Sequence, residues 1–209
     1  MIPCYQRILF WVLLLASVGM AVVLIRLRER AADRISGRYA AENSPQLSEL
    51  VAAAPEETVT LLEASDADGS VAPVTRKIAL PQETGARDRV LLRQLLADYA
   101  APQSKHPLAA GPGVEEVFFM PANQSGSAPQ SGEPGQTAVV NLTRDFAENH
   151  PSGIEPETLT LLSIVETLHG NFPAVRQVRF LVDGQPRETL AGHADLTRTY
   201  LTSSEDAQP

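Results

Sequence analysis

Apolar residues recur at helical spacing between Glu155 and Gly170. The positions on this stripe are Leu159, Leu161, Leu162, Val165 and Leu168. Pro156 near the start and Gly170 after the last periodic residue are typical boundaries of a helix. The pattern therefore predicts an amphipathic helix over this stretch, with one side facing a core.

A period of two follows this helix. From Val175 to Val182 apolar residues alternate with residues such as Arg179, which predicts a strand with one buried face. The Asp183-Gly184 pair comes next and fits a tight turn, because both residues tolerate a positive φ. We expect the chain to turn there and to return as a hairpin.

Earlier parts of the chain predict four more strands and one more helix. The strands are expected at Thr58–Glu63, Val71–Leu80, Val114–Met120 and Thr137–Leu142, and the helix at Arg87–Tyr99. Two helices and about six strands in this order favour an α+β fold. The predicted architecture is a two-layer sandwich, in which a mixed β-sheet carries both helices on one face.

The amino-terminal region has a different pattern. The 18 residues from Ile8 to Ile25 carry no charge, and as a helix they would cover about 27 Å, close to the thickness of a bilayer core. A cleaved signal peptide is the alternative. The long apolar run, and charged residues where a small-residue cleavage site would lie, favour an uncleaved transmembrane helix.

These patterns divide the chain into four parts. Residues 1–27 are the expected transmembrane anchor, and residues 28–57 are a stalk and a flexible linker, because large apolar residues are scarce there. Residues 58–201 form the expected domain. Within it, residues 121–135 are Ser, Gly, Pro and Gln-rich and are expected to be a flexible insert. Residues 202–209 are expected to be a disordered tail.

Charge and cysteine content exclude several classes of protein. Residues 1–40 hold six Arg and two acidic residues, which leaves 11 basic and 23 acidic residues, a net charge of -12, in the rest of the chain. An acidic domain repels phosphate backbones, so nucleic acid is not an expected partner. Cys4 is the only cysteine, so neither an internal disulfide nor a Cys-based zinc site is expected.

Several short segments of the chain carry a family resemblance. In the carboxy-terminal third they are SIVETL from Ser163, FPAV from Phe172, VRFLVDG from Val178 and GHADL from Gly192. Earlier segments that agree are PVTRKI from Pro73, the Leu95-Leu96 pair and VVNL from Val139. Together they resemble the GerMN domain of sporulation and spore germination proteins. The resemblance covers Thr58 to Tyr200, about two thirds of the chain, in a single copy.

This resemblance implies an extracytoplasmic module, usually tethered by a lipid or a membrane helix, and no enzymatic activity. It also implies a fold similar to the ring-building motifs of secretion and sporulation channels. The distribution of Arg gives the opposite orientation: Arg7 precedes the apolar run, whereas Arg26, Arg28 and others follow it. Because basic residues stay cytoplasmic, the Arg count predicts a cytoplasmic domain. Both expectations remain open at this point.

Candidate chemistry is sparse. His193 and Asp195, with Asp183 and His169 as further members, could converge at a turn as a metal or acid–base site, since imidazole and carboxylate groups are common ligands. The alternative, which we favour, is that His193 and Asp195 bond backbone groups and terminate the last strand.

Two other groups of residues suggest chemistry more weakly. Ser163 and Thr167 are possible nucleophiles on the second helix, but hydroxyls at such positions usually bond the carbonyl four residues back. Glu166, Asp183 and Glu188 could supply a carboxylate pair for glycan cleavage, but such a pair needs a cleft and a mutual spacing that the sequence does not indicate. We therefore expect no catalytic, cofactor-binding or metal site.

The sequence is compatible with two functions. The first is a non-enzymatic, single-pass membrane protein of the bacterial envelope that acts as a protein–protein interaction or assembly module, through an envelope partner or self-association. The second is an envelope domain that binds or hydrolyses cell-wall glycan or lipid. The second requires a pocket lined by His169, Asp183, His193 or Asp195.

Overall fold

The computed structural model describes Met20 and residues 51–52, 54–122 and 135–202. The chain divides into two compact units, Met1–Ser44 and Pro45–Pro209, and only the second is described as a fold. Apart from Met20, the expected anchor at 1–27 lies outside the described residues. So do most of the expected linker, the expected insert and the expected tail. No helix among the described residues is long and apolar enough to span a bilayer.

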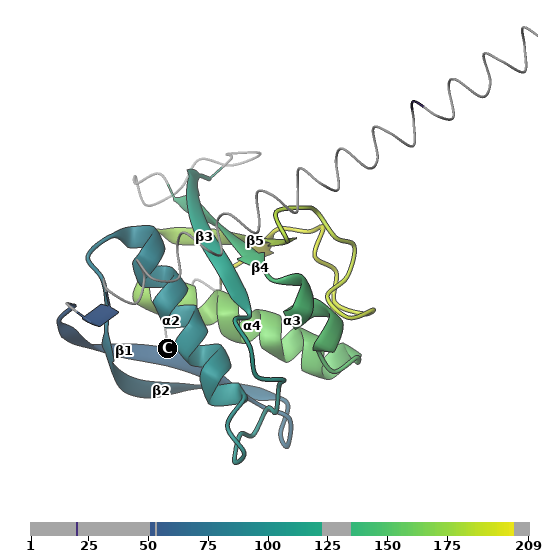
Figure 1. Ribbon diagram of the computed structural model, residues 1–209, viewed down its shortest axis with the longest axis horizontal. Helices are drawn as coiled ribbons and strands as arrows, with labels where there is room; N and C mark the ends of the chain where they lie inside the picture. Colours follow the sequence, from purple (N-terminus) through teal and green to yellow (C-terminus); the bar gives the residue numbers. More distant parts are fainter. Residues whose placement is uncertain (1–19, 21–50, 53, 123–134, 203–209) are drawn as a thin grey trace, which may run out of the picture. The chain divides into compact units, whose positions relative to one another are not determined.

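Nine helices and strands make up the described part of the domain (Figure 1). In chain order they are β1 (Glu56–Ser65), β2 (Ser70–Ala79), α2 (Thr84–Tyr99), β3 (Val114–Pro121), β4 (Gln136–Leu142), α3 (Arg144–Asn149), α4 (Ile154–Asn171), β5 (Val175–Val182) and β6 (Tyr200–Leu201). The predicted helices and the first five predicted strands of the domain are present within a few residues of their expected bounds. The short helix α3 was not predicted.

The strands form two sheets, so the expected single sheet is wrong. Because the two long helices lie between these sheets (Figure 1), the predicted two-layer sandwich is wrong as well. β1 and β2 make an antiparallel hairpin, and the other strands form a four-stranded sheet in the order β3-β4-β5-β6. The larger sheet is mixed, as predicted, because β4 and β5 run parallel while their outer neighbours are antiparallel. The chain thus has a mixed α+β fold with few helices.

The two long helices lie between the hairpin and the four-stranded sheet (Figure 1). α2 packs against β3 and α4 packs against β5, which places both on one face of the larger sheet, as predicted. Their opposite sides meet β1. Their apolar stripes supply fully buried residues: Leu91, Leu92 and Leu95 of α2, and Leu161, Ile164 and Leu168 of α4. Leu162, predicted on the buried stripe, is 37% exposed.

Helix side chains explain why the hairpin stays apart from the other strands. The free edge of β1 presents the N–H groups of Thr60, Leu62 and Ala64, which donate to Asn171 Oδ1 (3.3 Å), Thr167 Oγ1 (2.9 Å) and Tyr99 Oη (2.8 Å) in turn. The Asn171 amide also donates to the Thr60 carbonyl at 2.6 Å. Because these polar groups are satisfied by side chains, β1 needs no further strand on that edge.

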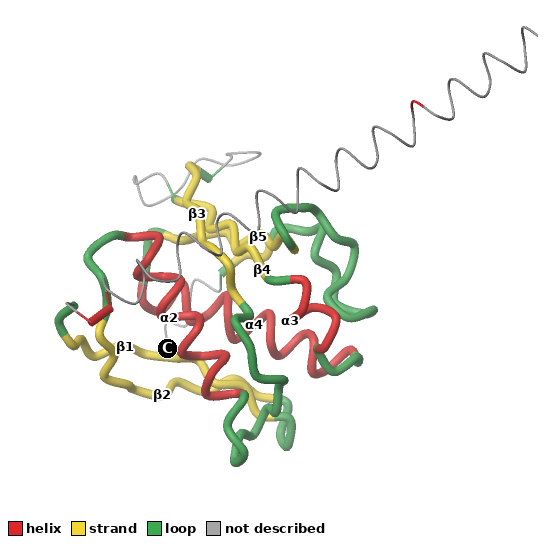
Figure 2. The backbone as a smooth tube through the Cα atoms, in the orientation of Figure 1, coloured by secondary structure: helices red, strands yellow, loops and turns green. Residues whose placement is uncertain are grey.

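The Asp183-Gly184 turn forms, but the predicted returning strand does not. Asp183 (φ 49°) and Gly184 (φ 69°) both adopt a positive φ. Val182 and Gln185 close the turn with two backbone bonds of 2.9 and 3.0 Å. The chain then runs as a long loop, green in Figure 2, and pairs with β5 again only at β6.

Candidate functional site

The loop between β5 and β6 is organised by one buried carboxylate, that of Glu157 on the first turns of α4. Its side chain is fully buried. Its Oε2 accepts backbone N–H bonds from Ala191, His193 and Ala194 at 2.8–3.0 Å, and its Oε1 accepts from Gly153 at 3.1 Å. These bonds fasten residues 191–194 of the loop to the start of α4.

Four backbone donors also fix the charge of Glu157. Burial by itself raises the pKa of a carboxyl group, but the N–H groups of Ala194, Ala191, Gly153 and His193 outweigh it and lower the pKa of Glu157 to about 2. The carboxylate is thus ionised at any physiological pH. Its arrangement is that of an anchor for a loop, with every oxygen already occupied by the protein.

His193 and Asp195 have separate partners in this loop. The His193 ring lies with Nδ1 3.0 Å from Glu157 Oε1 and 3.3 Å from Ser152 Oγ. Asp195 instead accepts from the backbone and hydroxyl of Thr197, at 2.8 and 2.6 Å, and these bonds lower its pKa. One residue fastens the loop to α4, and the other closes a turn within it.

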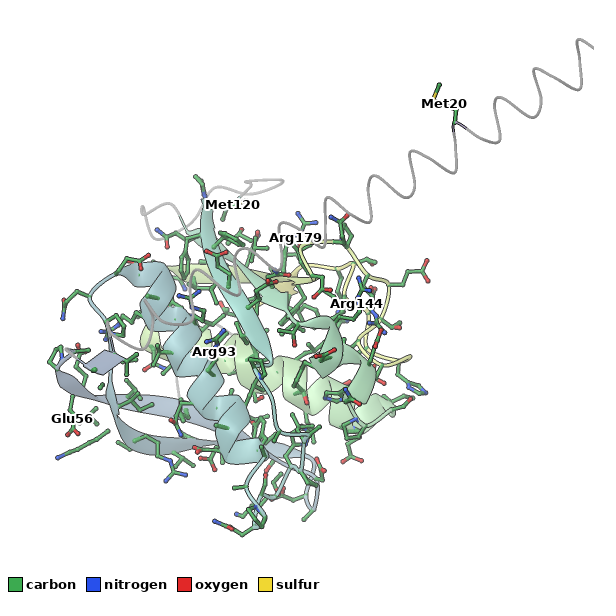
Figure 3. The ribbon with its side chains drawn as sticks, in the orientation of Figure 1. Met20, Glu56, Arg93, Met120, Arg144 and Arg179 are labelled. Atoms are coloured by element: carbon green, nitrogen blue, oxygen red, sulfur yellow. The ribbon has the colours of Figure 1, made fainter. Side chains whose placement is uncertain are left out.

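The remaining candidates are dispersed. His169 at the end of α4 has Nδ1 3.0 Å from the Val175 carbonyl, while Asp183 accepts from the Arg144 backbone and forms an ion pair of 3.1 Å with its guanidinium. Arg144, labelled in Figure 3, comes from α3. Among the described residues, no group of three or more His, Cys, Asp or Glu side chains could hold a metal ion.

The two hydroxyls on α4 serve the fold in different ways. Ser163 Oγ donates to the Thr160 carbonyl, three residues back, at 2.8 Å. Thr167 Oγ1 accepts from β1, as described above. Both side chains are fully buried. Two of the carboxylates that could have formed a glycan-cleaving pair are Asp183 and Glu188. Asp183 forms an ion pair with Arg144, and the backbone carbonyl of Glu188 accepts a hydrogen bond from the Leu196 N–H.

Two surface clefts are lined by other residues. One lies against Ala109–Pro112, Thr143, Asp145, Phe146 and Asn149. The other lies against Glu63, Ala64, Arg76, Asp98, Tyr99 and the 101–105 loop, and the Arg76 guanidinium there is already paired with Glu63 and Asp98 at 3.0 and 3.3 Å. Neither cleft is lined by His169, Asp183, His193 or Asp195.

Asp88 on α2 is a buried carboxyl group that the sequence did not single out. It is fully buried, and neither of its oxygens has a hydrogen-bond partner within the described part of the chain. Burial raises its pKa to about 7, with Arg87 opposing and Glu83 adding to the shift. No local pattern reveals it, because an Asp between two Arg residues is typical of an exposed helix surface.

The outer face of the four-stranded sheet, defined by alternate residues of its strands, carries large exposed side chains. Strand register places Phe118, Val139 and Arg179 in one row, and Met120, Thr137, Gln177 and Leu201 in the next. Phe118 is 45% exposed, Met120 41% and Leu201 72%. Met120 and Arg179 lie on the side of the sheet away from α2 and α4 (Figure 3). No described helix covers this outer face.

Comparison with known proteins identifies the family. The profile of the family described as "Germane: Sporulation and spore germination" matches residues 58–188, which is more than half of the chain. That description names no enzymatic activity. No curated protein matches the chain.

Three solved structures are similar. The first GerMN domain of the sporulation protein GerM from Bacillus subtilis is 14% identical, with a TM-score of 0.43, over 71% of this chain and 99% of that one. The tandem GerMN domains of the same protein are 13% identical, with a TM-score of 0.42, over 71% of this chain and 46% of that one. A putative lipoprotein from Clostridium perfringens is 17% identical, with a TM-score of 0.34, over 70% and 87%.

The family match runs from the third residue of β1 to the loop after β5, so it covers the hairpin, both long helices and strands β3, β4 and β5, but not β6. It includes the SIVETL and VRFLVDG segments of the predicted resemblance, whereas the GHADL segment from Gly192 lies beyond it. The chain therefore belongs to the Germane family of sporulation and spore germination domains, as its resemblance to the GerMN domain predicted.

Proposed function

We propose that this protein is a non-enzymatic domain of the bacterial envelope, tethered by a single membrane helix, which acts as a protein–protein interaction or assembly module. One observation supports the proposal above all: the outer face of the four-stranded sheet exposes large apolar side chains on both of its outer strands, Phe118 and Met120 on β3 and Leu201 on β6. Large apolar side chains grouped on one face of a soluble domain are typical of an interaction surface.

The chemistry of this outer face favours a different protein as the partner. Arg179 of β5 stands beside Val139 and Phe118 in one row. If two copies met face to face, their Arg179 side chains would be brought together in an apolar contact, which like charges oppose. A partner that offers apolar side chains around a carboxylate would satisfy both the apolar residues and Arg179.

The alternative function, binding or hydrolysis of cell-wall glycan or lipid, has less support. It requires a pocket lined by His169, Asp183, His193 or Asp195, but these residues belong to separate contacts: His193 with Glu157, Asp195 with Thr197, Asp183 with Arg144 and His169 with the Val175 carbonyl. A hydrolytic pair needs two carboxyl groups facing one substrate. An interaction module needs only the outer face.

Photo-crosslinking in the bacterium that encodes the chain tests the proposal. A photoreactive amino acid is placed at Phe118 or Leu201 on the outer face and, as a matched control, at Thr75, which is exposed on β2. We expect both outer-face positions, and not Thr75, to crosslink to the same second protein. Arg179→Glu should abolish that crosslink while the melting temperature stays unchanged, since Arg179 is exposed.

Three results would contradict the proposal. Equal crosslinking at Thr75 would show that contact is not specific to the outer face. Crosslinks only between two copies of this chain would replace the proposed partner with self-association. A crosslink that survives Arg179→Glu would remove the argument for a carboxylate on the partner.

A further inference from the structure

An unbroken chain of side-chain contacts runs through the interior and joins four segments that are distant in sequence. Asp66, in the turn after β1, has Oδ1 2.5 Å from His106 Nδ1. The other nitrogen, His106 Nε2, lies 2.7 Å from the Thr160 hydroxyl of α4. The same hydroxyl lies 2.8 Å from His150 Nε2, and His150 Nδ1 is 2.8 Å from the Pro151 carbonyl.

The middle of this chain is closed to solvent. His106 and Thr160 are fully buried, His150 is 6% exposed, and only the Asp66 end, 41% exposed at its side chain, reaches water. The Tyr99 ring packs edge-on against His106 with centroids 4.8 Å apart, and Phe146 packs similarly on His150 at 5.5 Å. The charged groups that act on His150 are Asp66, Glu157 and His106 itself.

Counting hydrogens restricts how this chain can be protonated. His106 Nδ1 faces a carboxylate and His150 Nδ1 faces a carbonyl, so each must carry a hydrogen. Both Nε2 atoms then face one hydroxyl, which has a single hydrogen to donate. If both rings are neutral, one Nε2 is left without a donor, which is costly inside a protein.

One added proton satisfies every atom. An imidazolium at His106 donates from both nitrogens, to Asp66 and to Thr160, and the Thr160 hydroxyl is then free to donate to His150 Nε2. Asp66 supplies the matching negative charge beside His106. A second proton, on His150, would turn the hydroxyl toward the Pro156 carbonyl 3.0 Å away and bury a second positive charge.

We propose that the Asp66–His106–Thr160–His150 chain holds one extra proton on His106, and that a second proton on His150 releases the contact between the 100–113 loop and the connection from α3 to α4. His106 belongs to the first of these segments and His150 to the second. The cleft lined by Ala109–Pro112 and by Thr143, Asp145, Phe146 and Asn149 lies where they meet. The hydrogen-bonded series Asp66–His106–Thr160–His150 is therefore a pH-sensitive latch beneath that cleft.

The direction of the pH effect follows from burial. Burial lowers the pKa of His150, and the nearby His106 acts the same way, while the Pro151 carbonyl, Glu157 and Asp66 oppose them. When the latch opens, His150 returns to its ordinary pKa of about 6.5. Opening is then coupled to uptake of one proton, so the opening constant rises about tenfold per pH unit as the pH falls below about 6.5.

The first test is nitrogen-15 NMR of the full chain with labelled histidine. The chain has four His residues, and each signal is assigned with a His→Gln variant. At pH 7 we expect His106 to carry hydrogen on both nitrogens and His150 to carry it on Nδ1 alone. Two neutral rings, or a hydrogen on His150 Nε2 alone, would overturn the proposal on the unmodified protein.

The second test uses matched variants of α4 hydroxyls. Thr160→Val removes the shared hydroxyl, Thr160→Ser keeps it, and Ser163→Ala removes a different buried hydroxyl of the same helix. We expect only Thr160→Val to change the His106 and His150 signals. Only this variant should also lose the rise of the opening constant below about pH 6.5, which is obtained from amide exchange at His106 and His150 after correction for the intrinsic exchange rate at each pH. Unchanged signals in Thr160→Val, or an opening constant that stays flat below pH 6.5 in the native chain, would refute the latch.

Discussion

At the scale of single residues, the strongest constraint is the carboxylate of Glu157. Four backbone N–H groups and the His193 ring surround it in a fully buried position. A neutral amide of the same shape cannot accept all these bonds, because its nitrogen would face N–H donors. Glu157→Gln should therefore lower the free energy of unfolding by about 2–3 kcal/mol at pH 7. Glu155→Gln, an exposed change in the same turn, is the control and should have little effect.

The contribution of the Glu157 carboxylate to the free energy of unfolding must decrease as the pH falls. Its pKa is lowered to about 2 in the fold, against 4.5 for a free carboxyl group. The carboxylate therefore stabilises the protein fully above about pH 4.5, and this contribution is lost as the pH falls toward 2. Urea unfolding between pH 2 and 7 should show the free energy of unfolding of Glu157→Gln approaching that of the native chain at acidic pH, while Glu155→Gln follows the native chain throughout. A constant difference for Glu157→Gln would contradict the assignment.

Asp88 should have the opposite dependence. Its pKa is raised to about 7 in the fold, against 3.8 when free, so the folded chain loses stability as the pH rises from 3.8 through 7. Asp88→Asn keeps the shape without the charge. It should match the native chain at pH 4 and exceed its unfolding free energy by about 2–4 kcal/mol at pH 7.

The control for Asp88 is Glu56→Gln, since Glu56 is an exposed carboxylate on β1, labelled in Figure 3. Its unfolding free energy should follow the native chain at every pH. If Asp88→Asn instead destabilises the protein at pH 7, the carboxylate has a stabilising partner that the described residues do not show.

At the scale of elements, the two edges of the hairpin are protected differently. Because the N–H groups of Thr60, Leu62 and Ala64 point toward the helices, the residues that face them on β2 point their N–H groups outward. Pro73, opposite Leu62, occupies one of these outward-pointing positions. Because Pro has no N–H, the hydrogen bonds between β1 and β2 are unaffected, and the outer edge of β2 offers one donor fewer to another strand.

The orientation of Pro73 predicts an asymmetry between neighbours. Pro73→Ala should change the unfolding free energy by less than about 1 kcal/mol, since no ladder bond involves its nitrogen. Val74→Pro should cost about 2–4 kcal/mol, because the Val74 N–H points toward its partner Leu61. Thermal unfolding of the two variants measures the difference. Equal losses would mean that the register of the hairpin is wrong.

Local patterns predicted the elements well and their assembly less well. The stripe of Leu91, Leu92 and Leu95 and the alternation in β5 gave the helix and the strand, because both depend on neighbours a few residues apart. The separation of the hairpin depends on contacts such as Thr60 with Asn171, 111 residues apart. The long loop before β6 depends on Glu157, which looks from the sequence like an ordinary acidic residue in the first turn of a helix.

The contrast between contacts of sequence neighbours and contacts of distant residues also explains what the sequence could and could not predict about the candidate site residues. The spacing of two residues between His193 and Asp195 suggests one shared site, yet their side chains bond different groups. No short spacing connects His106, Thr160 and His150 in the sequence, and only the fold brings them together in one buried hydrogen-bonded series. The outer face likewise becomes visible only when register aligns Met120, Gln177 and Leu201.

At the scale of the whole molecule, the proposed role requires the domain to lie outside the cytoplasm, where envelope partners are. The Arg residues after the apolar run of Ile8 to Ile25 favour the opposite orientation. A reporter enzyme that is active only outside the cytoplasm, fused after Pro209, separates the two. We expect activity in a bacterial host. Replacing Arg26, Arg28 and Arg30 by Gln should leave activity at least as high, since these charges oppose export.

A matched cytoplasm-active reporter at the same position is the control, and it should be inactive although the fusion is stably produced. The reverse pattern would place the domain in the cytoplasm. In that case the outer face could still bind a partner, because Phe118, Met120 and Leu201 would remain exposed. This result would contradict the proposed envelope role. It would not affect the fold or the membership of the Germane family, which rests on the match over residues 58–188.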